Sequence, residues 1–316
     1  MLDIKSNIPL KPLSNYKIGG SADYFSTANS EEDLISILKQ WQEISKDFSE
    51  DKKRVFVLGE GTNILISDSG VRGLVIHNKI EHIDLNGEIL TVRAGVLFRD
   101  MVSFCTENYL SGFEWAGGLP GTVGGAVRGN AGAFAGETKD NVLEVESIDI
   151  KTFSKKIRSR EKLSFSYRMS IFKQPDVSEI ITSVRFRITK GNKEEIMQKT
   201  KEKIDYRNQR HPLEYPNIGS IFKNTPFELV PENLQSEFRQ YLKTDPFPVM
   251  PSAKLISLAG LKGQRVGEAQ VSEKHPNFIV NLGNASSKDV LDLIEIVQRT
   301  IKDKYGISLD REIIYL

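Results

Sequence analysis

Residues 111–137 read Ser111-Gly-Phe-Glu-Trp-Ala-Gly-Gly-Leu-Pro-Gly-Thr-Val-Gly-Gly-Ala-Val-Arg-Gly-Asn-Ala-Gly-Ala-Phe-Ala-Gly-Glu137. Nine of these 27 residues are glycine, against 24 in the whole chain of 316. Glycine is costly to order, and it is tolerated where the backbone turns tightly or approaches a ligand closely. A flexible linker would be polar, whereas this stretch is mostly apolar. We therefore favour a buried loop that lines a ligand over a surface linker.

Two glycine turns in the chain can bind a phosphate group through the backbone. Pro120 can pre-set a turn or a first helical turn, and Gly121–Ala126 then offers backbone N–H groups with few side chains in the way. The second turn, Gly59-Glu-Gly-Thr-Asn63, lies between apolar segments at 54–58 and 64–66 that we expect to be strands. A Rossmann fingerprint needs a third glycine leading into a helix, and this turn has neither, so we reject that fold.

The composition excludes several classes of function. The net charge of +1 gives no pull toward nucleic acid or a membrane surface, and no apolar run is long enough to cross a bilayer. The chain shows no secretory signal at its start, so we expect a cytoplasmic protein. The single cysteine, Cys105, excludes an internal disulfide and is expected to fill a core. The four histidines form no metal-binding pattern, so no metal is expected.

Hydrophobic periodicity and capping residues predict a mixture of helices and strands. Ser30 and Ser287 are expected to cap helices, and Gly306 is expected to end one. The predicted helices are 30–41, 98–108, 193–209, 253–260 and 287–306. The predicted strands are 54–58, 64–66, 73–76, 89–94, 142–150, 155–159, 180–188, 278–281 and 312–316. In the first helix we expect Leu34, Ile35, Leu38 and Trp41 to share a face. In the charged helix at 193–209 we expect Ile196, Met197, Thr200 and Ile204 to do so.

Several motifs resemble, in order and spacing, those of one family, the UDP-N-acetylenolpyruvoylglucosamine reductases (MurB), in its shorter form. The motifs are Tyr16–Gly20, Gly59–Asn63, Leu119–Ala126, Asn130–Ala133, Tyr167–Ser170 and Gly219–Asn224. The resemblance implies an α+β fold. An FAD-binding domain of the vanillyl-alcohol-oxidase (PCMH) type would occupy 1–192, in two α/β subdomains divided near residue 77. A connecting helix at 193–210 would lead to a smaller α/β substrate domain at 211–316, whose last strand is a candidate to return to the first domain.

The resemblance also implies an activity, which is the reduction of the enolpyruvyl group of UDP-N-acetylenolpyruvoylglucosamine to a lactyl ether in peptidoglycan synthesis. NADPH would supply the hydride, FAD would be bound without a covalent bond, and the enzyme would act as a monomer. The implied substrate-binding residues are Tyr167, Arg168, Lys223 and Asn224. The implied cofactor-binding residues are Ile18, Gly19, Gly20, Gly59, Glu60, Gly61, Thr62, Asn63, Gly117, Pro120, Gly121, Thr122, Gly124, Gly125, Ala126, Asn130 and Gly132.

Three residues match the catalytic positions of the family. Arg168 would bind the substrate carboxylate, where negative charge builds up, although alone it would read as a structural arginine. Ser220 would donate a proton to the carbon that bears this carboxylate, although it could equally be a turn serine. Glu312, kept protonated, would donate a hydrogen bond at the same carboxylate; locally it could instead pair with Arg311.

Some features depart from the family pattern or leave alternatives open. Asn15, Thr62 and His211 replace the commoner threonine, serine and glutamine, and the chain stops at Leu316, soon after Glu312. None of these changes removes a catalytic group, although the short end leaves open how firmly Glu312 is held. The alternatives are another non-covalent FAD-dependent oxidoreductase of the same fold and a flavin-binding protein without activity. The presence of all three catalytic residues argues against the latter.

Overall fold

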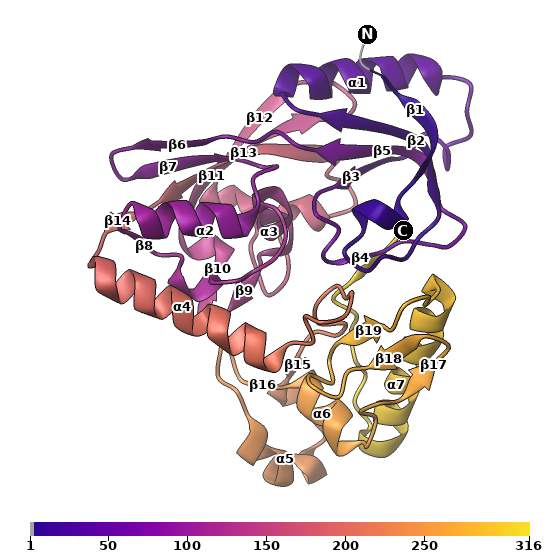
Figure 1. Cartoon of the computed structure of the whole chain (residues 1–316), viewed down its shortest axis with the longest axis vertical. Coiled ribbons are helices and arrows are strands. Elements are labelled where there is room, and N and C mark those ends of the chain that lie inside the picture. Colours follow the sequence, from indigo (N-terminus) through magenta and orange to yellow (C-terminus); the bar gives the residue numbers. More distant parts are fainter. Residues whose placement is uncertain (1–2) are drawn as a thin grey trace. The chain divides into compact units, whose positions relative to one another are not determined.

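The structure, a computed structural model, describes residues 3–316 as two compact units. Unit 1 contains the chain up to Ile8 together with Ala22–Glu60 and Val71–Arg207. Unit 2 contains Pro9–Ser21, Gly61–Gly70 and Asn208–Leu316. Both units mix helices and strands (Figure 1). Each unit is therefore assembled from segments that are distant in the sequence.

The first part of unit 1 is a four-stranded sheet in the order β1-β2-β5-β3. The strands are β1 (Lys5–Pro9), β2 (Ser21–Ala28), β5 (Val71–Asn78) and β3 (Val55–Leu58), and β5 pairs in parallel with both β2 and β3. Helix α1 (Glu31–Ile44) lies across this sheet (Figure 1). Ser30 caps it as predicted, accepting the Asp33 N–H at 3.0 Å. The buried face contains Ile37 in place of the predicted Ile35, which is half-buried.

The second part of unit 1 is a five-stranded antiparallel sheet in the order β12-β11-β13-β7-β6. The strands are β12 (Lys155–Ser159), β11 (Val142–Asp149), β13 (Glu179–Arg187), β7 (Ile89–Arg93) and β6 (Ile83–Asn86). Helices α2 (Phe98–Glu107) and α3 (Val123–Gly129) share one apolar core with it. Cys105 lies in this core, as predicted. Two short pairs complete unit 1: β8 (Leu110–Ser111) with β14 (Thr189–Lys190), and β9 (Gly132–Ala133) with β10 (Gly136–Glu137).

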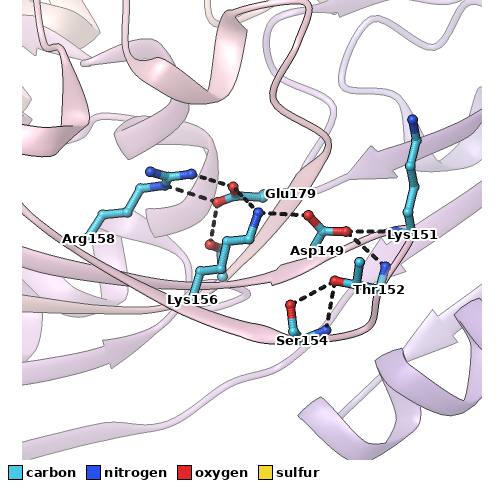
Figure 2. Close-up of polar contacts among 8 residues, drawn as sticks. Asp149, Lys151, Thr152, Ser154, Lys156, Arg158 and Glu179 are labelled. Carbon is cyan, nitrogen blue, oxygen red and sulfur yellow. Dashed lines mark hydrogen bonds and ion pairs between the residues drawn. The ribbon is translucent and has the colours of Figure 1, made fainter.

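A buried carboxylate links three neighbouring strands of this sheet. The Glu179 side chain is 2% exposed and accepts hydrogen bonds from Arg158 and Lys156 at 2.5 and 3.1 Å (Figure 2). It also accepts one from Ser147 at 2.7 Å. Burial alone would raise the pKa of Glu179, but these hydrogen bonds outweigh it and hold the pKa below its ordinary value. The hydrogen bond from Lys156 likewise lowers the pKa of Asp149.

Helix α4 (Lys193–Arg210) is mostly solvated, as its charge predicted. Its buried side chains are Ile196, Thr200 and Arg207. The prediction that Met197 and Ile204 share the buried side is wrong, because these two side chains are 49% and 38% exposed. The buried side chains are those at positions 196, 200 and 207. Positions 196 and 200 are about one helical turn apart, and positions 200 and 207 are about two turns apart.

Unit 2 has its own core, formed around helices α6 (Ser252–Leu258) and α7 (Ser287–Tyr305). A three-stranded sheet follows the order β17 (Arg265–Val266), β18 (Ala269–Val271) and β19 (Ile279–Asn281). Two strand pairs are β15 (Thr225–Pro226) with β16 (Val249–Met250), and β4 (Ile64–Leu65) parallel to β20 (Ile314–Tyr315). The remaining helix is α5 (Glu232–Phe238). Gly306 ends α7 with φ +70°, as predicted.

The start of α7 differs by one residue from the prediction. Ser286, and not Ser287, is the N-cap, and its hydroxyl accepts the Asp289 N–H at 3.0 Å. Ser287 occupies the first helical position, where its N–H and hydroxyl donate to the Asp68 carboxylate at 2.9 and 2.8 Å. Asp68 therefore acts as a second cap and joins the 61–70 segment to α7.

Candidate active site

The stretch 111–137 is buried only in part, since Gly118, Pro120, Gly125 and Ala135 are exposed, and it is not a single loop. It contains a 3₁₀ turn at Glu114–Ala116, helix α3 and the β9–β10 hairpin. Phe113, Trp115 and Val123 are at most 8% exposed. The apolar side chains that distinguished this stretch from a linker therefore belong to the core of unit 1.

The prediction that Gly121–Ala126 presents bare N–H groups is wrong for five of its six residues. Gly124 N–H donates to the Ala94 carbonyl at 2.9 Å, and Gly121 N–H donates to the Glu60 carboxylate at 2.8 Å. The other N–H groups with partners inside unit 1 are those of Val123, Gly125 and Ala126. Thr122 is the N-cap of α3 and accepts the Gly125 N–H. These bonds fix the start of α3 against the neighbouring chain.

The turn at 59–63 fits the predicted binding of a phosphate group better than Gly121–Ala126 does. Gly59 has no room for a side chain, because a Cβ would lie 2.7 Å from Thr122 Oγ1. Gly61 has φ +66°, and a Cβ there would lie 2.8 Å from the Leu13 carbonyl oxygen. Among residues 3–316, no hydrogen bond uses the N–H groups of Gly61, Thr62 or Asn63. Three consecutive open donors on a glycine turn fit an anionic group such as a diphosphate.

The Ile18-Gly19-Gly20 segment owes its glycines to close packing inside unit 2. A Cβ on Gly19, which has φ +130°, would lie 2.7 Å from the Ile66 side chain. A Cβ on Gly20 would lie 2.4 Å from the Asp68 carbonyl oxygen, and its N–H donates to Ser67 at 2.8 Å. Ile18 is 2% exposed. The segment thus supports the chain that follows the 59–63 turn.

Asn130 ends α3 with φ +42° and is fully buried. Its side chain donates to Glu137 at 3.2 Å and to the Ser166 carbonyl at 3.0 Å, and it accepts the Lys139 N–H at 3.1 Å. The predicted cofactor contact of this side chain thus competes with three hydrogen bonds inside the protein. Asn130 instead joins α3 to the turn that carries Arg168.

Arg168 lies at the tip of a tight turn in unit 1. Ser166 and Met169 exchange two backbone hydrogen bonds of 3.1 Å, and Arg168 itself has φ +57°. Its Nη2 donates to the Gly132 carbonyl at 2.8 Å, and its guanidinium carbon lies 4.9 Å from the centre of the Tyr167 ring. The structure thus brings together three predicted positions: Arg168, Tyr167 and Gly132.

Ser220 and Glu312 lie on paired segments of unit 2. Glu312 N–H donates to the Ile221 carbonyl at 2.8 Å, and Lys223 N–H donates to the Asp310 carbonyl at 2.9 Å. Asn63 Nδ2 donates to the Glu312 carbonyl at 3.3 Å. The backbone of Glu312 is therefore bonded on two sides, which answers the question raised by the short chain end.

Two functional groups on this pair of segments are open to a ligand. Neither the Ser220 hydroxyl nor the Lys223 ammonium has a hydrogen-bond or ion-pair partner within residues 3–316. Asn224 Oδ1 accepts the Ser252 N–H at 3.2 Å. Arg311 donates to Gln298 at 3.3 Å. A half-buried hydroxyl and a cation three residues apart can serve one polar, anionic ligand.

Asn277 is a positioning residue that the sequence did not reveal. Its side chain donates to the Phe222 carbonyl at 2.8 Å and accepts the Phe222 N–H at 3.0 Å. Its own carbonyl accepts the Ile221 N–H at 2.8 Å. These three bonds hold the segment that follows Ser220. The available signal was a polar residue two positions before strand β19, in His275-Pro-Asn-Phe278.

The described residues contain neither a metal-binding cluster nor a membrane-spanning helix. Residues 3–316 contain no group of three or more His, Cys, Asp or Glu side chains arranged to hold a metal ion. Within the same range, every helix is too short or too polar to span a bilayer.

Comparison with known families identifies the class of protein. Residues 23–152 match the family described as FAD binding domain, and residues 211–316 match the family described as UDP-N-acetylenolpyruvoylglucosamine reductase, C-terminal domain. Together with the open donors at 61–63, these matches define an FAD-containing oxidoreductase with the predicted α+β fold.

Whole-chain relatives identify the family. A UDP-N-acetylenolpyruvoylglucosamine reductase of Caldanaerobacter subterraneus is 36% identical over 97% of this chain and 91% of its own length. One from Clostridium kluyveri is also 36% identical, over 98% of this chain and 92% of its own length. The crystal structure of UDP-N-acetylenolpyruvylglucosamine reductase (MurB) from Thermus caldophilus is similar, with a TM-score of 0.76 and 30% sequence identity. The match covers 100% of this chain and 99% of that one. The chain belongs to the UDP-N-acetylenolpyruvoylglucosamine reductase family, which confirms the resemblance.

Proposed function

We propose that the chain reduces the enolpyruvyl group of UDP-N-acetylenolpyruvoylglucosamine to the lactyl ether of UDP-N-acetylmuramate, with NADPH as hydride donor. The observation that carries the proposal is the pairing of the Ser220–Lys223 segment with Asp310–Glu312, because it places an open hydroxyl, an open cation and a carboxyl group on adjoining backbone. The family membership supplies the substrate that these groups would recognise.

FAD, when bound, supplies the hydride taken from NADPH. The open N–H groups of Gly61–Asn63 would hold its diphosphate. The other predicted cofactor contacts, including Gly117, Pro120, Gly121, Thr122 and Gly132, remain part of this proposal.

The catalytic residues have separate roles in the proposal. Arg168 binds the substrate carboxylate and stabilises the negative charge that builds up there. Ser220 Oγ gives its proton to the carbon that bears this carboxylate. Glu312, protonated, donates a hydrogen bond to the carboxylate. Lys223 binds the substrate diphosphate, and Asn224 and Tyr167 contact its polar groups.

Two further parts of the proposal concern the whole molecule. The enzyme acts in the cytoplasm as a monomer, on small molecules and without a nucleic-acid partner, which light scattering and titration with oligonucleotides would check. Residues 1–192 bind the cofactor, 193–210 form a connecting helix and 211–316 bind the substrate. Segments 9–21 and 61–70 are in the same compact unit as 211–316, so separate expression of 1–192 and 211–316 would check whether this division also holds for folding.

The decisive experiment separates the two half-reactions. The wild-type protein should carry FAD that acid or heat releases, and NADPH should bleach it. Adding the enolpyruvyl nucleotide sugar should restore the oxidised spectrum. Ser220→Ala should leave bleaching unchanged and slow reoxidation by about 10²–10⁴-fold, as expected for loss of a general acid. Ser308→Ala, an exposed serine of the same unit, is the control.

The same experiment has clear contrary outcomes. A protein without FAD, or one that is not reoxidised by this substrate, would refute the assigned activity. Reoxidation of Ser220→Ala at the wild-type rate would instead leave the activity standing and move the proton donor to another group.

A further inference from the structure

Asn15 bonds to two segments of unit 2 that the proposed function uses. Its N–H donates to the Gly61 carbonyl at 3.3 Å, and its side-chain Nδ2 donates to the Asn217 carbonyl at 2.7 Å. Gly61 begins the run of open N–H groups, and Asn217 lies shortly before Ser220 in the chain. One asparagine therefore joins the turn at 61–63 to the segment that carries Ser220.

The backbone at Asn15 is held in place by the next residue, Tyr16, which is fully buried. The Tyr16 hydroxyl donates to the Ile279 carbonyl at 2.8 Å, and the Tyr16 carbonyl accepts a hydrogen bond from Asn281 Nδ2 at 3.1 Å. Burial raises the pKa of Tyr16, so its hydroxyl stays protonated and keeps this donor. Asn15 is therefore fixed to the core of unit 2, although the residue itself is exposed.

The contact with the turn at 61–63 is made by the backbone. A Cβ on Gly61 would lie 2.8 Å from the Leu13 carbonyl oxygen and 3.1 Å from Ser14 Cα, so the turn rests directly on this part of the chain. The bond to the Gly61 carbonyl comes from the Asn15 N–H. A substitution of the Asn15 side chain therefore leaves the support of the turn in place.

The contact with the Ser220 segment depends on the Asn15 side chain. Asn217 is 7% exposed, and within the part of the chain that the structure describes its carbonyl accepts no other hydrogen bond. The Asn217 side chain accepts the Gly219 N–H at 3.1 Å and donates to the Tyr215 carbonyl at 2.9 Å. Gly219 has φ +80°, so the chain turns sharply directly before Ser220. A shift of Asn217 is therefore passed through this turn to Ser220.

Other contacts anchor the chain after Ser220. Ile221 N–H donates to the Asn277 carbonyl at 2.8 Å, and the Ile221 carbonyl accepts the Glu312 N–H at 2.8 Å. Neither bond fixes the chain before Ser220. Asn15 supplies that anchor, and it does so from the same residue that supports the turn at 61–63.

We propose that Asn15 is a positioning residue for proton transfer, whose side chain fixes Ser220 relative to the turn that holds the cofactor. This inference rests on the proposed function, because it takes Ser220 to be the proton donor and the 61–63 turn to hold FAD. The donor must reach one carbon of the substrate while the cofactor delivers hydride to its neighbour, so the placement of the two is shared. A displacement of about 1 Å can slow such a reaction by about 10²-fold.

The test compares Asn15→Ala with Asn284→Ala, the same substitution at another exposed asparagine of unit 2. Asn15→Ala should keep its FAD and its rate of flavin reduction by NADPH. Reoxidation by a saturating concentration of the enolpyruvyl nucleotide sugar should slow by about tenfold or more. The substrate concentration that gives half the maximal rate should stay within about threefold of wild type, because a positioning residue does not contact substrate. Asn284→Ala should match the wild-type protein throughout.

Three further measurements separate positioning from a general structural role. Asn15→Asp keeps the size of the side chain but has no donor, so its reoxidation should be as slow as that of Asn15→Ala. Adding Asn15→Ala to Ser220→Ala should slow reoxidation no further than Ser220→Ala alone, within about threefold, whereas independent effects would multiply. The Gly219 amide should exchange its hydrogen about fivefold faster in Asn15→Ala, as expected for the loss of one hydrogen bond, and this readout does not depend on activity.

Each contrary outcome is distinguishable. Reoxidation of Asn15→Ala at the wild-type rate, a further slowing of Ser220→Ala by about tenfold, or unchanged exchange at Gly219 would each overturn the inference. Loss of FAD from folded Asn15→Ala would make the side chain a support of the cofactor turn and would overturn it too. If Asn15→Ala does not fold, Asn15→Asp decides in the same assays. A wild-type protein that lacks FAD, or that this substrate does not reoxidise, would refute the proposed function itself, so it is measured first.

Discussion

We expect Asn277→Ala to loosen the segment that carries Ser220 without touching the reacting groups. The substitution removes the two side-chain hydrogen bonds to Phe222, of 2.8 and 3.0 Å. It leaves the bond from Ile221 N–H to the main-chain carbonyl of residue 277 in place. The segment would then keep one of its three bonds to this loop.

The size of the effect follows from burial. Phe222 is 2% exposed and Asn277 is 4% exposed, so the freed N–H and carbonyl do not reach bulk water. An unsatisfied buried group costs about 1–3 kcal/mol, which gives about 2–6 kcal/mol for the two. A water molecule entering the space left by the amide would bring the loss to the lower half of that range. We expect the free energy of unfolding to fall by about 2–4 kcal/mol.

The assay combines urea unfolding with the two half-reactions. The control is Asn284→Ala, an exposed asparagine in unit 2. Because Ser220 is displaced, reoxidation by the substrate should slow while flavin reduction by NADPH stays near wild type. A stability within about 0.5 kcal/mol of the control would contradict the energetic argument. A large loss of stability with normal reoxidation would show that the bonds to Phe222 do not position Ser220.

Three other predictions concern separate contacts. Arg168→Lys keeps the charge but loses the planar geometry and the bond to Gly132, so it should slow reoxidation by substrate more than reduction by NADPH; equal slowing of both would remove the carboxylate role. Asp68→Ala removes the second cap of α7 and should lower the free energy of unfolding, measured in urea, by about 1–2 kcal/mol. The control Ser69→Ala should show no change, and an unaltered midpoint of urea unfolding in Asp68→Ala would contradict the capping role. Glu179 has a depressed pKa in the folded state, so its contribution to stability is present above the ordinary pKa of about 4.3 and is lost as the pH falls through the folded value. Glu179→Gln should therefore flatten the decline of the free energy of unfolding below about pH 4, and an unchanged dependence on pH in this range would argue against this network.

Local patterns predicted most elements, because they depend on neighbouring residues. Ser30 and Gly306 were recognised as helix ends because a capping hydroxyl and a residue that tolerates positive φ both act within one turn. The strands β1 and β2 were missed, since β2 is half-buried along most of its length and has no clear alternation. Ser286 is the cap because Asp289, three residues later, completes a capping box with it, whereas the neighbouring Ser287 bonds to Asp68.

Long-range assembly could not be predicted from any one stretch. The 9–21 and 61–70 segments belong to unit 2, although the residues around them belong to unit 1. The family motifs located Ser220 and Glu312, but their pairing becomes visible only when the 220–223 backbone meets 310–312. Asn277 was missed for the same reason: its partners lie 55 residues away in the chain.

Glycine density and ligand binding prove to be separate properties in this chain. Gly20, Gly59 and Gly117 are glycine because a Cβ would meet a neighbouring carbonyl or hydroxyl at 2.4–2.7 Å, which is a packing requirement with no ligand in it. Five of the six N–H groups of the glycine-rich stretch 121–126 are bonded within the same packing. What marks a binding site is a polar group left without a partner at a place the fold holds rigid. By that criterion the open N–H groups at 61–63 and the hydroxyl of Ser220 are positions that a bound ligand can complete.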